Sequence, residues 1–276
     1  MNEENKLEIR KPESFITAKQ SIKLYRQRWR RLKFHVASLD RLTGGGLHSR
    51  GIVEIAGDAG SGKTQLALHL ALVAQVQPID DMPRRGVVYI ITEHPFPSRR
   101  ITQMEKAFKK NARILSAPEK FNFTDNIFVE HLHSPTALEQ CLSDRLPVLL
   151  ENNPIELLII DSVAAVYGDE QNYVDRAQSF RRVVHALHLL QERFDFAVVC
   201  TNQVRSVVDE MTLDEERVVP ALGLAWASLV HTRIQLSRVI GNHERTCRLL
   251  FSPTAPPGQC EFVITEAGIS DATEPL

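Results

Sequence analysis

Several features that mark secreted, membrane or strongly charged proteins are absent from this sequence. Its four cysteines are widely scattered and form no C-x-x-C pair, so they indicate a reducing compartment, the cytosol or the nucleus. No apolar run approaches the roughly 20 residues of a membrane span, and the residues after Met1 are polar, unlike the core of a signal peptide. The formal net charge is −1, so contact with nucleic acid would need a local basic patch.

The composition favours one globular α/β domain with a short N-terminal extension. Hydrophobic residues make up 43% of the 276 residues, which is ample for a sizeable core. We expect an arm with a basic linker over residues 1–37 and the folded core over residues 38–276.

One stretch fits the phosphate-loop pattern G-x-x-x-x-G-K-[ST] at every fixed position. It reads Gly57-Asp58-Ala59-Gly60-Ser61-Gly62-Lys63-Thr64 and is followed by Gln65. An apolar run precedes it and a helical run follows it, and strand, glycine loop and helix together predict a phosphate site. We expect Lys63 to reach the β- and γ-phosphates and the Thr64 hydroxyl to ligate Mg²⁺. The alternative is a glycine-rich turn with a solvated lysine.

The periodicity of the remaining chain favours a mostly parallel sheet covered by helices on both faces, because continuous apolar runs alternate with helical segments. Helices are expected over residues 38–42, 65–73, 98–113, 134–150 (interrupted at Pro147) and 174–193. Strands are expected over residues 51–56, 87–93, 126–130, 157–161, 196–203, 232–236, 246–251 and 261–265. Residues 204–220 are expected to form a polar loop.

Three of these strands end in side chains suited to nucleotide chemistry. In an open parallel sheet, ligands bind at the carboxyl ends of the strands. Asp161 suits the second acid that holds Mg²⁺, Glu93 suits a base that orients and deprotonates water, and Gln203 suits a sensor of the γ-phosphate. The plain alternatives are a helix cap for Asp161, a surface carboxylate for Glu93 and, for Gln203, an amide that satisfies backbone groups.

The N-terminal region leaves several interpretations open. Phe15 lies in an otherwise polar arm, which either folds back on its own domain or docks on another chain. Residues 19–33 are predicted to form a basic helix with Tyr25 and Trp29 on one face. That helix suits a nucleic-acid patch, a subunit linker or a solvated surface helix.

A metal site built on histidine has little support in the sequence. His185 and His188 are three positions apart on the predicted helix 174–193, but no third ligand is evident. Such histidines are usually surface or core residues.

The motifs of this chain resemble those of the RecA/RadA-type recombinase ATPases, and in particular their eukaryotic paralogue branch. They also occur in the same order along the chain as in that family. The resemblance covers about residues 14–270 and rests on segments 39–46, 57–65, 89–93, 159–165, 201–204 and 252–253. Segments 96–100, 127–131, 145–150 and 217–223 resemble the paralogue branch itself. The resemblance implies a RecA-like P-loop ATPase core with C-terminal antiparallel strands, and ATP with Mg²⁺ as cofactors.

The resemblance also implies roles for individual residues. Glu93 stands at the position of the family's catalytic glutamate. Arg100 stands where an arginine stacks on adenine, and Gln203 stands where a glutamine couples the γ-phosphate to the second DNA loop. Phe15 and Ala18 fit the family's F-x-T-A motif, in which the Phe and Ala fill pockets on the adjacent subunit.

The chain departs from the strand-exchange members of that family at three places. The first loop carries Gly168-Asp169-Glu170 where those members keep an arginine nearby. The loop after Gln203 carries Asp209, Glu210 and further acidic residues where those members have a Gly-rich, basic loop, and acidic side chains repel phosphates. Phe251 stands where those members have an aspartate that caps the neighbour's ATP.

We therefore expect an ATP-binding, weakly hydrolysing subunit of homologous-recombination repair of DNA double-strand breaks. Its expected partners are another recombinase paralogue, in a heterodimer or larger complex, the main recombinase filament, and single-stranded or branched DNA. We expect no membrane partner and a nuclear location, with some protein in the cytoplasm. The alternatives are an interaction module with a purely structural nucleotide and an autonomous DNA-stimulated strand-exchange ATPase.

Overall fold

The computed structural model describes residues 16–22, 30–76, 85–110, 121–168, 172–208, 216–238 and 243–272. The chain divides into two compact units, Met1–Arg30 and Arg31–Leu276, and the division predicted after residue 37 stays a prediction. In the first unit, residues 18–22 form a helical turn. Thr17 and Gln20 cap it reciprocally. The backbone amide and the hydroxyl of Thr17 both donate to the Gln20 side-chain oxygen at 2.9 Å, and the Gln20 backbone amide donates to the Thr17 hydroxyl at 3.2 Å.

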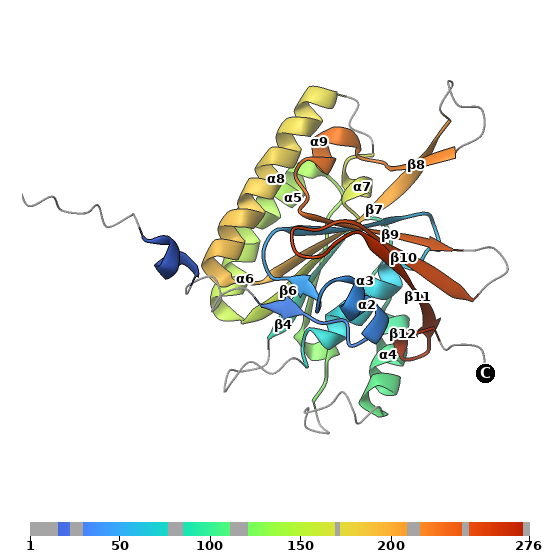
Figure 1. The fold of residues 1–276 in the computed structure, drawn as a ribbon. Helices are drawn as coiled ribbons and strands as arrows, with labels where there is room; N and C mark the ends of the chain where they lie inside the picture. Colours follow the sequence, from blue (N-terminus) through green and yellow to red (C-terminus); the bar gives the residue numbers. More distant parts are fainter. Residues whose placement is uncertain are drawn as a thin grey trace, which may run out of the picture. The chain divides into compact units, whose positions relative to one another are not determined.

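The second unit is built on a large sheet with the order β12-β11-β10-β9-β3-β7-β6-β4-β5 (Figure 1). The strands from β9 to β5 pair in parallel, and β9 to β12 pair antiparallel. The parallel strands are β3 Ile52–Gly57, β4 Gly86–Ile91, β5 Ile127–His131, β6 Ile155–Asp161, β7 Ala197–Val208 and β9 Thr232–Arg238. The antiparallel extension consists of β10 Glu244–Phe251, β11 Gly258–Thr265 and β12 Gly268–Asp271. The predicted fold class is confirmed.

Helices cover both faces of this sheet, which explains the continuous apolar runs of its strands. One core cluster joins alternate strand residues to α3 Lys63–Val73 and α4 Ser98–Lys110. The opposite cluster joins the other residues of the same strands to α8 Tyr173–Phe194 and α9 Gly223–Ala227 (Figure 1). The other described elements are β1 Arg31–Leu32, α2 Ala37–Leu42, β2 Leu47–His48, η1 Thr124–Asn126, α5 Pro135–Gln140, the π-turn η2 Cys141–Arg145, α6 Leu146–Asn152, α7 Val163–Val166 and β8 Glu216–Pro220.

The basic helix predicted over residues 19–33 is wrong at its C-terminal end. Arg31–Leu32 form strand β1, which pairs with β2 Leu47–His48. The helix of the described part ends at residue 22, and residues 23–29 lie outside the described ranges. Leu32, Phe34 and Val36 are all buried and alternate with polar residues, and this period of two is the pattern of a strand. The basic residues between them hid that pattern.

The polar loop predicted over residues 204–220 is also wrong. Strand β7 continues to Val208 and pairs antiparallel with β8 Glu216–Pro220, so the backbone forms a hairpin. Pairs of valines stand on either side of the charged segment, and β-branched residues favour strands. Pro147 does not interrupt a helix: it lies in the first turn of α6, which follows the π-turn directly.

His69 ties the helix after the phosphate loop to the surrounding core. Its Nε2 donates to the Phe34 carbonyl at 2.7 Å, and its Nδ1 accepts from the Ile269 amide at 3.2 Å. Complete burial lowers the pKa of His69 to about 4, so the folded protein holds a neutral ring.

We expect this histidine to make folding stability depend on pH. Because its pKa is lower in the folded than in the unfolded chain, its stabilisation is complete above the unfolded pKa and is lost as pH falls towards 4. The loss between about pH 7 and about pH 5 should be about 2 kcal/mol. Urea unfolding at both pH values measures it. His69→Gln should remove this part of the pH dependence, and an unchanged difference in the variant would contradict the assignment.

Candidate nucleotide-binding site

Four neighbouring strands bring their carboxyl ends to one edge of the sheet. In the order β3, β7, β6 and β4, each strand is paired in parallel with the next. The residues that follow or end these strands are those singled out by the sequence: the phosphate loop, Gln203, Asp161 and Glu93. Parallel pairing is therefore what gathers side chains that lie up to about half the chain apart.

The phosphate loop has the backbone that a close approach to an anion requires. Gly60 and Gly62 have φ values of +75° and +106°, in the left-handed region that L side chains rarely adopt. A Cβ on Gly57 would lie 2.5 Å from the Leu236 carbonyl oxygen and from the Ser61 hydroxyl. Gly62 is the N-cap of α3, whose first amides have no partner within the helix. The loop thus presents the amides of the first turn of α3 and the positive end of a helix dipole.

Lys63 places its ammonium over the mouth of this loop. Its Nζ donates to the carbonyls of Gly57 at 2.7 Å and Asp58 at 2.9 Å. Burial lowers the pKa of Lys63, while the charges of Asp161, Asp58 and Glu93 oppose that shift. The lysine is therefore a partly desolvated cation beside carboxylates, which suits the binding of phosphate oxygens.

Asp161 is held by three hydroxyl groups. Its Oδ2 accepts from Thr64 at 2.9 Å and from Tyr89 at 2.7 Å, and its Oδ1 accepts from Thr201 at 2.5 Å. Burial and the charge of Asp161 raise the pKa of Tyr89 well above its usual value, so the phenol stays a donor. The pairing of Thr64 with Asp161 unites the two predicted metal ligands, and hydroxyl and carboxylate oxygens are the donors that Mg²⁺ prefers.

Glu93 lies next to Asp161 on the adjacent strand end. Its Oε1 accepts from Ser162 at 3.1 Å and from Gln203 at 2.8 Å, so it contacts the residue after the adjacent strand β6 and also β7, the next strand along the sheet. Thr92 fixes this arrangement, because its hydroxyl donates to the Ser162 carbonyl at 2.8 Å and accepts from the Ser162 amide at 2.9 Å. The Glu93 side chain is 33% exposed, so water can reach it.

Arg100 of α4 connects the first turn of α3 to the turn between β11 and β12. Its guanidinium donates to the Gln65 side chain at 2.8 Å and to the carbonyls of Thr265 at 2.6 Å and Glu266 at 3.2 Å. These contacts hold the guanidinium beside the nucleotide-binding helix.

If Arg100 stacks on the adenine, Arg100→Ala should weaken ATP binding about fivefold, the size of one cation–π contact. The affinity for inorganic triphosphate, which has no base, should stay the same. Competition titrations with both ligands measure this, and Gln103→Ala, which removes an exposed partner of Arg100, is the control. An equal loss for both ligands would contradict the base contact.

The predicted docking residues, Phe15 and Ala18, precede the unit that carries the nucleotide-site candidates, and their role stays a prediction. Phe15 lies outside the described residues. Ala18 is exposed and belongs to the first unit, whose helical turn it begins.

The sequence analysis missed the residues that hold the two carboxylates. These are Tyr89, Thr92, Ser162 and Thr201. Each is a hydroxyl residue in or directly after a predicted strand, and that shared type and position is the signal that would have found them.

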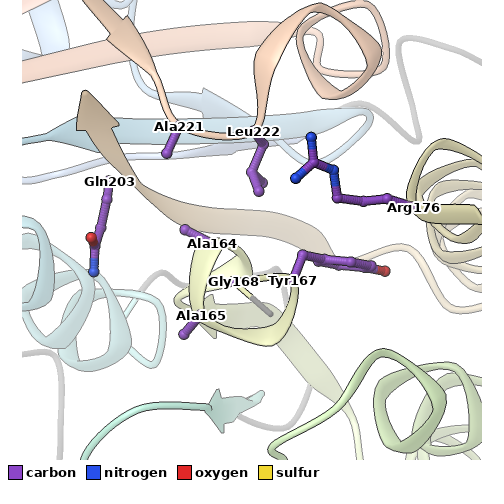
Figure 2. A pocket seen from close by; sticks show the side chains of 8 residues that line it. All are labelled: Ala164, Ala165, Tyr167, Gly168, Arg176, Gln203, Ala221 and Leu222. Atoms are coloured by element: carbon purple, nitrogen blue, oxygen red, sulfur yellow. The ribbon is translucent and has the colours of Figure 1, made fainter. Parts of the chain in front are cut away.

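A cavity of about 160 Å³ lies between Gln203 and Arg176 (Figure 2). Gln203 lines one side, and Arg176 of α8 extends towards Leu222 on the other. The remaining lining residues are Ala164, Ala165, Tyr167, Gly168 and Ala221. The cavity therefore borders both Gln203 and the residues at the base of the β7–β8 hairpin.

No helix in the described ranges combines the length and apolar character that crossing a membrane requires. Nor do these ranges contain three histidine, cysteine or acidic residues grouped so that they would hold a metal ion, His185 and His188 included.

A phosphate loop set in a parallel sheet, with an acid on each of two neighbouring strand ends, defines a RecA-like P-loop ATPase fold. The chain belongs to the Rad51 family, whose sequence profile matches residues 25–272. It is 34% identical to the DNA repair protein XRCC3 of Mus musculus over 265 residues, which cover 87% of this chain and 74% of the mouse protein. The XRCC3 of Bos taurus is 34% identical over 255 residues, with the same coverage. The XRCC3 homolog of Arabidopsis thaliana is 31% identical over 274 residues, covering 84% of this chain and 90% of the plant protein.

Proposed function

We propose that this chain is a recombinase-paralogue subunit that binds MgATP and hydrolyses it slowly in the homologous-recombination repair of DNA double-strand breaks. The observation that carries the proposal is the meeting of Lys63, Thr64, Asp161, Glu93 and Gln203 at one edge of the sheet. These are the groups that phosphoryl transfer needs: a cation, metal ligands, a base and a sensor.

The roles follow from the contacts of each side chain. When bound, Mg²⁺ neutralises charge on the β- and γ-phosphates. Lys63 exchanges the carbonyls of Gly57 and Asp58 for phosphate oxygens, and Thr64 and Asp161 hold the metal. Glu93 orients a water molecule and accepts its proton. Gln203, bonded to Glu93, links this base to the β7–β8 hairpin.

Slow turnover is supported by the way Glu93 is engaged. One of its oxygens already accepts from two donors, Ser162 and Gln203, so only the other oxygen is left to orient a water molecule and accept its proton. The same observation favours a second candidate function, an interaction module in which the nucleotide is structural only.

Assembly with another recombinase paralogue is supported by two features. Phe15 and Ala18 fit a docking motif in which small and aromatic side chains fill pockets of an adjacent subunit. Phe251 is 37% exposed where an ATP-capping aspartate would stand, so this face suits a partner that does not need its nucleotide capped. We propose that the complex assists the main recombinase filament on single-stranded or branched DNA in the nucleus, and is also present in the cytoplasm.

Co-purification with a second paralogue, with and without ATP and Mg²⁺, tests the proposed function. A complex that survives washing only with nucleotide is the expected result. A complex of equal stability without nucleotide would contradict a role for ATP in assembly. Tight binding of single-stranded DNA by the isolated chain, falling steeply with salt, would favour an autonomous strand-exchange ATPase instead.

A further inference from the structure

A buried carboxylate lies on β3, the strand that leads into the phosphate loop. Glu54 of β3 is fully buried and stands three residues before Gly57. It accepts from Asn202 of β7 at 2.6 Å, from Trp226 of α9 at 2.9 Å, and from the guanidinium of Arg233 on β9. Burying a charge is costly unless it is paired and fully hydrogen-bonded. One carboxylate therefore links three elements to the nucleotide-binding strand.

Successive side chains of residues 201–203 in β7 point alternately towards the nucleotide site and towards Glu54. Successive side chains of a strand point to opposite faces. Thr201 and Gln203 point to the nucleotide side, where they bond Asp161 and Glu93, whereas Asn202 between them bonds Glu54 on the other side. Gln203 is thus connected through the backbone of β7 to the bond between Asn202 and Glu54.

The same carboxylate oxygen also bonds a side chain of α9, the helix that follows the β7–β8 hairpin. Oε1 of Glu54 accepts from both Asn202, which lies at the entry of the hairpin, and Trp226, which lies in the helix after its exit. Between them, the Ala221 amide donates to the Gln203 carbonyl at 2.8 Å and closes the base of the hairpin. The segment from 202 to 226 is therefore anchored at both ends to one atom of β3.

The pair with Arg233 balances the charge of this arrangement. The Arg233 guanidinium also lies over the Phe251 ring, with 5.3 Å between its central carbon and the ring centre. Trp226 packs against Phe180 of α8 with 5.4 Å between ring centroids. Burial and the charge of Glu54 raise the pKa of the Cys200 thiol. The bonds of Glu54 are thus shielded from solvent, so water does not compensate for a change in one of them.

We propose that Glu54 is a positioning residue that couples nucleotide occupancy to the β7–β8 hairpin, through its shared bonds to Asn202 and Trp226. The inference rests on the proposed nucleotide binding. A bound γ-phosphate draws Gln203 away from Glu93, the move shifts Asn202 on the same strand, and Glu54 passes the change to Trp226. Ligands on the hairpin act on the nucleotide by the same route in reverse, since coupling between sites is reciprocal.

Trp226 provides a direct signal for this coupling. The chain has two tryptophans, Trp29 and Trp226, so Trp29→Phe leaves Trp226 as the sole emitter. We expect a non-hydrolysable ATP analogue with Mg²⁺ to change Trp226 emission with the midpoint that calorimetry gives for the same analogue. Binding measured by calorimetry without any change in emission would overturn the inference and leave the proposed function intact. Failure to bind at all would overturn both.

Two variants in the Trp29→Phe background test the route. Asn202→Ala removes the bond from β7 to Glu54 and should abolish the emission change even at nucleotide concentrations that saturate the site. Glu54→Gln keeps an oxygen that accepts from both Asn202 and Trp226, so it should retain the change. A full response in Asn202→Ala, or a folded, nucleotide-binding Glu54→Gln without one, would overturn the proposal. If Glu54→Gln fails to fold, Asn202→Ala decides alone.

A matched control separates coupling from loss of packing. Ser179 of α8 is buried, and its hydroxyl bonds Tyr167 and Glu139 rather than Glu54. Ser179→Ala therefore removes buried hydrogen bonds on the same face of the sheet, and the emission change should persist. Loss of the change in this control as well would attribute the signal to general loosening and contradict the specific route.

Discussion

Replacement of Lys63 by alanine is expected to abolish ATP binding. The ammonium is the cation at the mouth of the phosphate loop, held over it by the carbonyls of Gly57 and Asp58. A hydrogen bond to a charged group contributes about 1.5–3 kcal/mol, and Lys63 is expected to make at least two with phosphate oxygens. The loss of affinity should therefore be roughly 100-fold or more.

Calorimetric titration with ATP and Mg²⁺ measures this loss directly. Lys106→Ala is a suitable control, because Lys106 is an exposed lysine on α4 and its removal changes the net charge equally. The Lys63 variant should also lose the nucleotide dependence of its complex with a second paralogue. Native affinity in Lys63→Ala would contradict the placement of the phosphates in this loop.

Glu93→Gln is expected to stop ATP turnover while leaving ATP binding intact. Glutamine has the same size and keeps an oxygen that accepts from Ser162 and Gln203, so the local hydrogen bonds survive. It has lost the negative charge that accepts a proton from water. General base catalysis contributes roughly 100-fold to 10,000-fold, and a fall of that order in phosphate release is expected.

Single-turnover phosphate release by the purified complex is the appropriate measurement. His94→Gln is the control, because His94 is the next residue and its side chain is 88% exposed. Complexes held together by ATP should last longer in the Glu93 variant, since slow hydrolysis delays their release. Unaltered turnover would remove Glu93 as the base and favour the structural-nucleotide candidate.

The main features of the site were predictable because each depends on local sequence. The phosphate loop needs glycines at fixed spacing, and Asp161 and Glu93 each follow a continuous apolar run. Runs of this kind predict buried parallel strands, and parallel strands place their carboxyl ends at one edge. The fold class followed from the same runs.

The supporting residues were not predictable, because they depend on which strands are neighbours. Ile160 is paired with Cys200, so the next residues, Asp161 and Thr201, meet. Tyr89 lies two residues before Ile91, the partner of Asp161, and therefore points to the same face. Strand order and register are set by the packing of the whole sheet, so neither can be predicted from local periodicity.

Charge masked the strand pattern at two other places. In residues 31–36 and 204–220, charged residues stand among alternating or β-branched apolar residues. The high charge of these segments indicated a polar helix and a polar loop, and it concealed the period of two that marks a strand. The buried ion pair of Glu54 and Arg233 was missed for a related reason. A lone glutamate within an apolar strand has no local partner in the sequence, and its partner lies 179 positions away.

Titration of the native chain with a non-hydrolysable ATP analogue, with Mg²⁺ present and then removed by a chelator, tests the central claim most directly. The arrangement of Lys63, Thr64 and Asp161 predicts one saturable site per chain that weakens strongly when the metal is removed. No saturable binding, or binding that is indifferent to Mg²⁺, would contradict it.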